Sequence, residues 1–303
     1  MVIIEDLGVQ ELTVYDIQTE TTNMFFANDI LVHNSMYLKM EKFVSMFNTT
    51  DPIQITRKLD KLCKELMQPV IEKSFQELAE YVNAFEQAMR MKREAIAEKG
   101  IWTGKKHYIL NCWDIEGVEF TKPELKIVGI EVVKSSTPQI CRKSLKDAIG
   151  LIVNESEVNV QKYIKDFKTE FFGKSFEEIA FPRGVKNLRK YADGGSIWGK
   201  GCPIHVKGSL IYNHLLKKQG LVGKYPLIEE NDKIKFAYMK RGNPYNIPVF
   251  AIVDEFPNEL GLEKFVDYDT QFEKTFFDPL NNIMKVIGWN AEKINTMEAF
   301  FED

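Results

Sequence analysis

Short apolar runs separated by turn residues fill the first 34 positions of the chain. The runs lie at residues 2–4, 12–17, 24–26 and 30–32. Their length and composition are typical of β-strands, with Gly8 and Asn28-Asp29 as turn signals. So little chain cannot bury a hydrophobic core by itself, and we expect a small all-β piece.

A helical period replaces this pattern further along. Between Asp51 and Val82 the apolar positions are Leu59, Leu62, Leu66, Val70, Phe75, Leu78 and Val82. This spacing predicts a long helical segment with a kink at Pro69.

Strands are predicted again between residues 86 and 133. The clearest are 106–113 and 126–130, separated by the turn-like stretch Asp114 to Gly117, so a hairpin-rich sheet is expected. Hydroxyl residues precede Pro138, which predicts a capped helix start with proline at the first helical position and helices up to about Phe172. The fold class is therefore predicted as α+β.

Composition is that of a globular protein, with 303 residues, 44% hydrophobic and 12% aromatic. No apolar run approaches the roughly 18 residues of a membrane span, and the first residues are acidic, so we expect a cytoplasmic protein with no membrane partner. The four cysteines form no C-x-x-C pair, which argues against a zinc ribbon or a disulfide framework.

Charge is distributed unevenly along the chain. Residues 1–34 carry six acids and no Lys or Arg. Residues 182–241 hold 13 Lys and Arg against 4 Asp and Glu, whereas residues 254–303 hold 4 against 12. The basic stretch fits a phosphate backbone, and the alternative is a solvated face of scattered lysines.

The triplet His33-Asn34-Ser35 brings three reactive groups together. The side-chain nitrogen of Asn34 can attack its own main-chain carbonyl and break the bond to Ser35, with His33 placed to protonate the leaving amine. Ser35 can carry an acyl group from another polypeptide as an ester. An Asn-Ser pair that merely deamidates is the alternative.

The run from Val14-Tyr15-Asp16-Ile17 to Val32-His33-Asn34, followed by Ser35, resembles the C-terminal splicing region of inteins. The resemblance implies that Asp16 lies near the upstream splice junction, that His33 assists cyclisation of Asn34, and that Ser35 begins the flanking protein. Many inteins have a histidine where this chain has Asn23. Because a complete intein is several times longer, we expect a split intein whose larger half is on another polypeptide, one that is basic if charge steers the association.

Five motifs follow in one order: Lys92-Arg93-Glu94-Ala95-Ile96-Ala97, Trp102-Thr103-Gly104-Lys105-Lys106-His107-Tyr108, Trp113-Asp114-Ile115-Glu116-Gly117, Leu125-Lys126-Ile127-Val128-Gly129 and Lys134-Ser135-Ser136-Thr137-Pro138. They resemble the C-terminal part of family B DNA polymerases of the T-even phage replicative type. The intein resemblance implies a split-intein fragment at 1–34. The polymerase resemblance implies the C-terminal part of the palm, a mixed α/β portion, at 35–133, a largely helical thumb at 134–290 and a clamp-binding tail at 291–303.

In that family a D-T-D-S strand carries catalytic aspartates, and Ser35-Met36-Tyr37-Leu38 matches it only from the serine onward. The family's S-L-Y-P and N-S-x-Y-G motifs are absent as well. The resemblance thus implies an N-terminal polymerase half that supplies the metal ligands, with two Mg²⁺ ions bound in the assembled enzyme only and no metal held by this chain. Primer-template DNA and deoxynucleoside triphosphates would be the substrates.

The resemblance also implies DNA contacts. Lys105, Lys106 and Tyr108 match the family form K-K-R-Y, with His107 in place of the arginine and Tyr108 expected on the same strand face as Lys106; a solvated strand edge is the alternative. Further contacts are implied for Lys134, Ser135 and Ser136, otherwise an ordinary helix start, and for His205 and Lys207 in a C-P-x-H-x-K-G segment. Glu94 is either a supporting carboxylate or a surface residue.

The acidic C-terminal end contains Met297, Phe300 and Phe301. In the relatives a similar peptide docks on the sliding clamp, and the alternative is that these side chains pack back onto the thumb. The leading hypothesis is the C-terminal half of a split, intein-containing replicative polymerase. The alternative is a non-catalytic DNA-binding or processivity subunit with an inactive intein remnant.

Overall fold

The computed structural model describes residues 24–27, 30–33, 37–192 and 196–292. The chain divides into two compact units. Unit 1 lies within residues 1–99 and 111–124, and unit 2 lies within residues 100–110 and 125–303. Helices and small sheets occur together, which is compatible with the predicted α+β class.

Two short strands are described near the start of unit 1. Strands β1 (Met24–Ala27) and β2 (Ile30–His33) pair antiparallel, with Met24 opposite His33. The strands predicted at 24–26 and 30–32 are confirmed.

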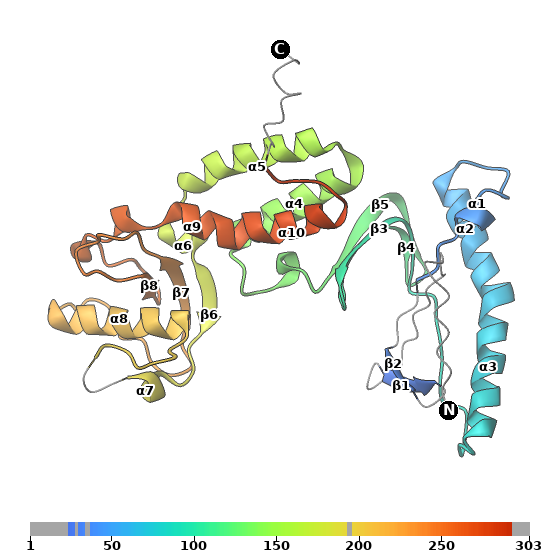
Figure 1. Ribbon diagram of the computed structural model, residues 1–303, viewed down its shortest axis with the longest axis horizontal. Coiled ribbons are helices and arrows are strands. Elements are labelled where there is room, and N and C mark those ends of the chain that lie inside the picture. The colour runs from blue at the N-terminus through green and yellow to red at the C-terminus, as the bar shows by residue number, and fades with distance from the viewer. Residues whose placement is uncertain (1–23, 28–29, 34–36, 193–195, 293–303) are drawn as a thin grey trace, which may run out of the picture. The chain divides into compact units, whose positions relative to one another are not determined.

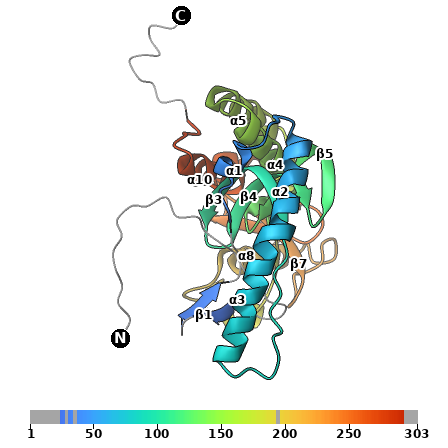
Figure 2. The same ribbon diagram turned by 90° about the vertical axis from the view of Figure 1, so that its right-hand side faces the viewer.

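A helical rod forms most of the rest of unit 1. After the short helix α1 (Glu41–Val44), the rod consists of α2 (Pro52–Leu62), the π-helical turn η1 (Cys63–Met67) and α3 (Gln68–Tyr81), which follow one another without a break (Figure 2). Asp51 caps α2, since its carboxylate accepts a hydrogen bond of 3.1 Å from the Ile53 amide. The predicted long helix is confirmed. Its irregularity is a π-turn just before Pro69, which has no N–H to donate to the helix ladder.

The central sheet consists of β3 (Ala95–Gly104), β4 (His107–Ile115) and β5 (Val118–Val128), in that order. Two-residue turns at 105–106 and 116–117 join the strands, as the expected hairpins require. Each strand has residues in both units.

Unit 2 contains a second sheet, in which β6 (Phe181–Gly184), β7 (Lys233–Tyr238) and β8 (Val249–Ile252) are antiparallel neighbours. Helix α8 (Ile204–Lys218) lies along this sheet (Figure 1). A Cβ atom on Gly208 would lie only 3.1 Å from the Ala251 Cβ, so glycine permits the close approach of α8 to β8.

A helical layer completes unit 2. Its longest helices are α4 (Gln139–Asn154) and α5 (Glu157–Phe172), and the aromatic rings of Phe167, Phe171, Phe272 and Phe276 pack together within its core. The remaining elements are η2 (Glu131–Val133), α6 (Phe176–Ile179), α7 (Leu188–Tyr191), η3 (Asn258–Leu260), η4 (Glu263–Phe265), α9 (Tyr268–Phe272), η5 (Glu273–Phe277) and α10 (Asp278–Val286).

The predicted cap of α4 is wrong in detail. Pro138 is the N-cap residue rather than the first helical residue, and no side chain caps this helix. Pro138 has extended backbone angles, so the helix begins only after it and the hydroxyl residues at 135–137 lie too far upstream. Within the described ranges, every helix is too short or too polar to cross a bilayer.

Candidate nucleic-acid interface

The predicted splice residues lie mostly outside the described part of the chain. Asp16, Asn23, Asn34 and Ser35 are among the residues that the structure does not describe. His33 is the last residue of β2, which ends directly before the Asn34-Ser35 bond.

The Lys105-Lys106 pair forms the turn between β3 and β4. Lys106 has a φ angle of +63°, so it is a turn residue and not part of a strand. The expectation that Lys106 and Tyr108 share a strand face is therefore wrong. The pair forms instead the tip of a hairpin, where both residues are exposed.

Gly129 supports this turn from the end of β5. A Cβ atom at position 129 would lie 2.3 Å from the Lys106 carbonyl oxygen and 2.6 Å from the His107 ring, and φ is +74°. Only glycine tolerates both the close approach and that backbone conformation. Gly129 thereby fixes where the two lysines lie.

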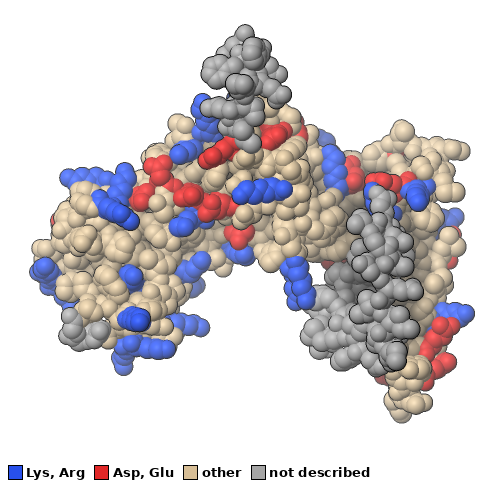
Figure 3. Space-filling view, in the orientation of Figure 1, with Lys and Arg blue, Asp and Glu red and all other residues tan. Residues whose placement is uncertain are grey.

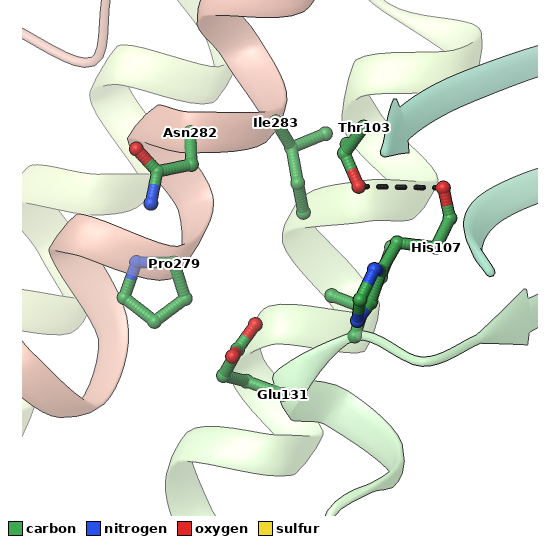
Figure 4. Close-up of a pocket in the computed structure, with 7 residues that line it drawn as sticks. Thr103, His107, Glu131, Pro279, Asn282 and Ile283 are labelled. Atoms are coloured by element: carbon green, nitrogen blue, oxygen red, sulfur yellow. Dashed lines mark hydrogen bonds between the residues drawn. The ribbon is translucent and has the colours of Figure 1, made fainter. Parts of the chain in front are cut away.

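A cavity of about 360 Å³ lies beside the same turn. Thr103 and His107 from the ends of β3 and β4 face Pro279, Asn282 and Ile283 of α10 across it (Figure 4). The Thr103 hydroxyl donates a hydrogen bond of 3.4 Å to the His107 carbonyl. Glu131 adds a carboxylate to the lining, which disfavours a phosphate ligand in this cavity.

Lys134, Ser135 and Ser136 lie between η2 and α4, as predicted for a segment before a helix. The Lys134 ammonium is paired with Glu131 at 2.8 Å, and both side chains are exposed. An exposed pair of this kind is weak, so a phosphate can compete for Lys134.

Arg183 of β6 is a cation that the sequence analysis did not single out. Its Nη1 donates hydrogen bonds to the carbonyl oxygens of Ser136 (2.9 Å) and Pro182 (3.2 Å). Burial lowers the pKa of Arg183 from its usual value. Arg183 thus anchors the Ser135-Ser136 segment through the backbone.

His205 and Lys207 lie in the first turn of α8. Burial, together with the nearby charge of Arg183, lowers the pKa of His205, so its imidazole is neutral at pH 7 and offers a phosphate a hydrogen bond but no charge. The Lys207 ammonium lies 5.1 Å from the centre of the Trp198 ring, a cation–π contact that orients the lysine. The sequence analysis did not single out Trp198.

The basic stretch, residues 182–241, runs through β6, α7, α8 and β7 of unit 2. Lys and Arg side chains gather over α7 and α8, whereas Asp and Glu gather over α9 (Figure 3). The cations described in this stretch are Arg183, Lys186, Arg189, Lys190, Lys200, Lys207, Lys217, Lys218, Lys224, Lys233, Lys235, Lys240 and Arg241.

Arg93 of the Lys92-Arg93-Glu94 motif is the centre of an ion-pair network in unit 1. Its guanidinium contacts Asp60 of α2 at 2.8 Å and Asp114 of β4 at 2.5 Å, and it is only 15% exposed. Burial opposes the charge, but the hydrogen bonds and charges of Asp114 and Asp60 outweigh it and raise the pKa of Arg93. Glu94 accepts a main-chain hydrogen bond from the Glu116 amide.

Metal ligands and the tail complete the set of predicted features. The described residues contain no group of three or more His, Cys, Asp or Glu side chains arranged to hold a metal ion, so they do not fit a two-Mg²⁺ centre.

The residues of the predicted clamp-binding tail, Met297, Phe300 and Phe301, lie outside the described residues.

Comparison with known proteins identifies relatives. No protein-family model matches the chain. The chain is 34% identical over 258 residues to the DNA-directed DNA polymerase of Escherichia phage RB69 and 32% identical over 256 residues to that of Enterobacteria phage T4. Each match covers 80% of this chain and 28% of the relative, so the chain spans little more than a quarter of the length of these curated relatives. Over 80% of its length, the chain is thus similar to a part of the DNA-directed DNA polymerases of these two phages.

Proposed function

We propose that this chain is the C-terminal half of a split replicative DNA polymerase, which trans-splicing at Asn34 and Ser35 joins to an N-terminal half. The match to 28% of the length of two DNA-directed DNA polymerases is the observation that carries this proposal. The intein-like pattern ending in Val32-His33-Asn34 directly precedes Ser35, where the polymerase resemblance begins. A splice junction between Asn34 and Ser35 accounts for both the intein-like pattern before that bond and the polymerase resemblance after it.

Four residues would carry out the splicing reaction: Asp16, His33, Asn34 and Ser35. Ser35 would attack the last carbonyl carbon of the N-terminal polymerase half and form an ester, which breaks the bond from that carbonyl to its own intein piece and releases that piece as the leaving group. Asp16 would act near this upstream junction. The Asn34 side-chain nitrogen would then attack the Asn34 carbonyl carbon, closing a succinimide and breaking the bond to Ser35 while His33 protonates the leaving amine. The freed amine of Ser35 would convert the ester to an amide.

In the joined enzyme, this chain would hold primer-template DNA. The hairpin tip with Lys105 and Lys106 and the first turn of α8 with His205 and Lys207 offer donors to phosphates. Lys134 and the Ser135-Ser136 segment offer a third contact. Two Mg²⁺ ions would act at carboxylates of the N-terminal half, and a sliding clamp would bind the tail with Met297, Phe300 and Phe301.

The test is co-expression with the N-terminal polymerase half from the same source. We expect a ligated product that contains residues 35–303 and a released intein, and we expect Asn34→Ala and Ser35→Ala to abolish the ligated product. Asn48→Ala, an exposed asparagine outside the splice region, is the matched control and should splice normally. Normal ligation in both the Asn34→Ala and the Ser35→Ala variants would refute the assigned roles. Strand elongation by the unspliced chain alone would refute the split polymerase.

A further inference from the structure

Arg183 of β6 links two segments of unit 2 that the sequence analysis treats as separate DNA contacts. Its Nη1 donates a hydrogen bond of 2.9 Å to the Ser136 carbonyl, which lies just before α4. Its positive charge also acts on the imidazole of His205, which lies in the first turn of α8. Ser136 and His205 are far apart in the sequence, and the fold brings both of them to one guanidinium.

Aromatic rings hold this cluster on the second sheet. The guanidinium carbon of Arg183 lies 5.8 Å from the centre of the Phe181 ring. The Phe181 ring stacks on the Phe236 ring at 5.3 Å, and the His205 ring lies 6.2 Å from the Phe236 ring. Phe181 and Phe236 are opposite each other in the pairing of β6 with β7, so the sheet fixes where both the guanidinium and the imidazole lie.

Several hydrogen-bond donors of the cluster are open to a ligand. Among the described residues, Nε and Nη2 of Arg183 find no acceptor, and the His205 imidazole and the hydroxyls of Ser135 and Ser136 have no hydrogen-bond partner. Ser135 is exposed, and the other three residues are partly buried. A guanidinium beside an imidazole and hydroxyls is a set of donors suited to the oxygens of a phosphate.

His205 is uncharged at pH 7 while no anion is bound. Burial and the charge of Arg183 both lower its pKa. The neighbouring groups supply no negative charge: β7 presents Phe236, the ammonium of Lys207 lies over Trp198, and burial raises the pKa of the Cys202 thiol. A phosphate bound beside Arg183 would reverse this balance, because its negative charge favours the protonated imidazole.

We propose that Ser135, Ser136, Arg183 and His205 form one binding site for a backbone phosphate of DNA, and that His205 takes up a proton from solvent when the phosphate binds. No bond of the DNA changes in this step. The inference rests on the proposed role in DNA binding and goes beyond it, since it assigns Arg183 to the site and makes the affinity for DNA depend on pH.

The experiment measures the affinity for a duplex DNA oligonucleotide by fluorescence anisotropy, from about pH 5.5 to about pH 8 at one salt concentration. The parent chain carries Asn34→Ala, which prevents cleavage at the splice junction, and His107→Gln, which removes the titratable group next to the Lys105-Lys106 turn. His205→Gln keeps a hydrogen-bond donor but cannot take up a proton. His214→Gln is the matched control, because His214 is an exposed histidine of the same helix.

We expect the affinity of the parent to rise as the pH falls, by up to about tenfold per pH unit, which is the limit for one proton taken up. His205→Gln should lose most of this slope, and His214→Gln should keep it. An equal slope in the two variants, a parent affinity that does not change with pH, or no binding of the duplex at any pH would overturn the inference.

A second measurement tests the part of Arg183. In nuclear magnetic resonance spectra, the His205 imidazole of the free chain should titrate at a lower pH than an ordinary histidine, and added DNA should move this titration to higher pH. Arg183→Gln should also move it to higher pH in the free chain, because the repelling charge is gone. The same variant should reduce the slope of log affinity against log salt concentration by about 0.9, as expected for one lost phosphate contact. An unchanged His205 titration or an unchanged salt slope in this variant would exclude Arg183 from the site.

The outcome is distinguishable from a failure of splicing. A pH slope that depends on His205, in a chain that never gives a ligated product with the N-terminal half, would leave the phosphate site standing and refute the splicing proposal. Normal ligation by a chain whose DNA affinity does not respond to His205→Gln would do the reverse.

Discussion

At the scale of single residues, the position of the Lys105-Lys106 turn depends on a glycine 23 residues further along the chain. Gly129 combines a positive φ angle with a space too small for a Cβ atom beside the Lys106 carbonyl. The two lysines were recognisable from their charge and motif. Their place at a hairpin tip was not, because it depends on the backbone conformation of Lys106, which no side-chain pattern encodes.

Gly129→Ala should therefore destabilise unit 2 and displace the turn. We expect a loss of about 2–3 kcal/mol in the free energy of unfolding, measured by urea denaturation, because backbone strain adds to a clash with a carbonyl. Gly261→Ala is the control, since Gly261 has a φ angle of +61° but no atom within 4 Å of the place where a Cβ would lie, and should lose only about 1 kcal/mol. Equal losses for the two variants would contradict the close approach at Gly129.

The lowered pKa of Glu259 makes the stability of the folded protein depend on pH. Hydrogen bonds from Lys224 and Tyr225 lower the pKa of Glu259 from 4.5 to about 2. A carboxylate whose pKa is lower in the folded state stabilises it above its unfolded pKa, and this contribution is lost as the pH falls through the folded pKa. Glu259→Gln should thus reduce the loss of stability between about pH 4.5 and pH 2, followed by urea midpoints. An identical profile for Glu259→Gln and the parent chain would contradict the assignment.

At the scale of elements, Arg93 ties the helical rod to the central sheet within unit 1. It joins Asp60 on α2 to Asp114 on β4, and Asp114 also accepts a hydrogen bond from the Gly117 amide in the following turn. Periodicity predicted the helix and alternation predicted the strands. The ion pair between them escaped prediction because its partners are 33 and 21 residues away from Arg93.

Arg93→Gln should cost about 3–5 kcal/mol of unfolding free energy, because it leaves the buried Asp114 carboxylate without its charged partner. Arg57→Gln is the matched control. Arg57 also makes two hydrogen bonds of 2.8 Å to a carboxylate of unit 1, that of Glu119, but its side chain is 68% exposed, so a cost below about 1 kcal/mol is expected. Similar urea midpoints for the two variants would show that burial does not distinguish these pairs.

The second sheet could not be predicted from the pattern of apolar and polar residues. Strands β6 and β8 have four residues each, and β6 contains Pro182. Such short segments carry too few alternations to be recognised, and they are brought together over about 70 residues of chain. The sequence predicted only helices and a basic surface for this region.

At the scale of the whole molecule, the two units differ in how much apolar surface they bury. Unit 2 has an extended core with packed phenylalanine rings, whereas unit 1 has five buried hydrophobic residues among those described. The hypothesis of a separate N-terminal polymerase half followed from the polymerase motifs that the sequence lacks. The exposure of Leu66 and Val70 is visible only once the rod is known, because both residues fit the apolar period as well as the buried Leu59 and Phe75 do.

This asymmetry predicts unequal protection from hydrogen exchange in the isolated chain. Amides of α2 and α3 should exchange faster than those of α4 and α8, because fewer buried contacts oppose local opening. Mass-spectrometric exchange measured on the chain with Asn34→Ala and Ser35→Ala would show this. Equal protection of the four helices would contradict the view that the fewer buried contacts of α2 and α3 make them easier to open.

The central claim is that Ser35 becomes bonded to another polypeptide. Peptide mass spectrometry of the co-expressed halves tests it most directly, since a proteolytic peptide that spans the junction reports the residue preceding Ser35. The account predicts that this residue comes from the N-terminal polymerase half and that the peptide disappears in the Asn34→Ala variant. Peptides in which Ser35 is always preceded by Asn34 would contradict it.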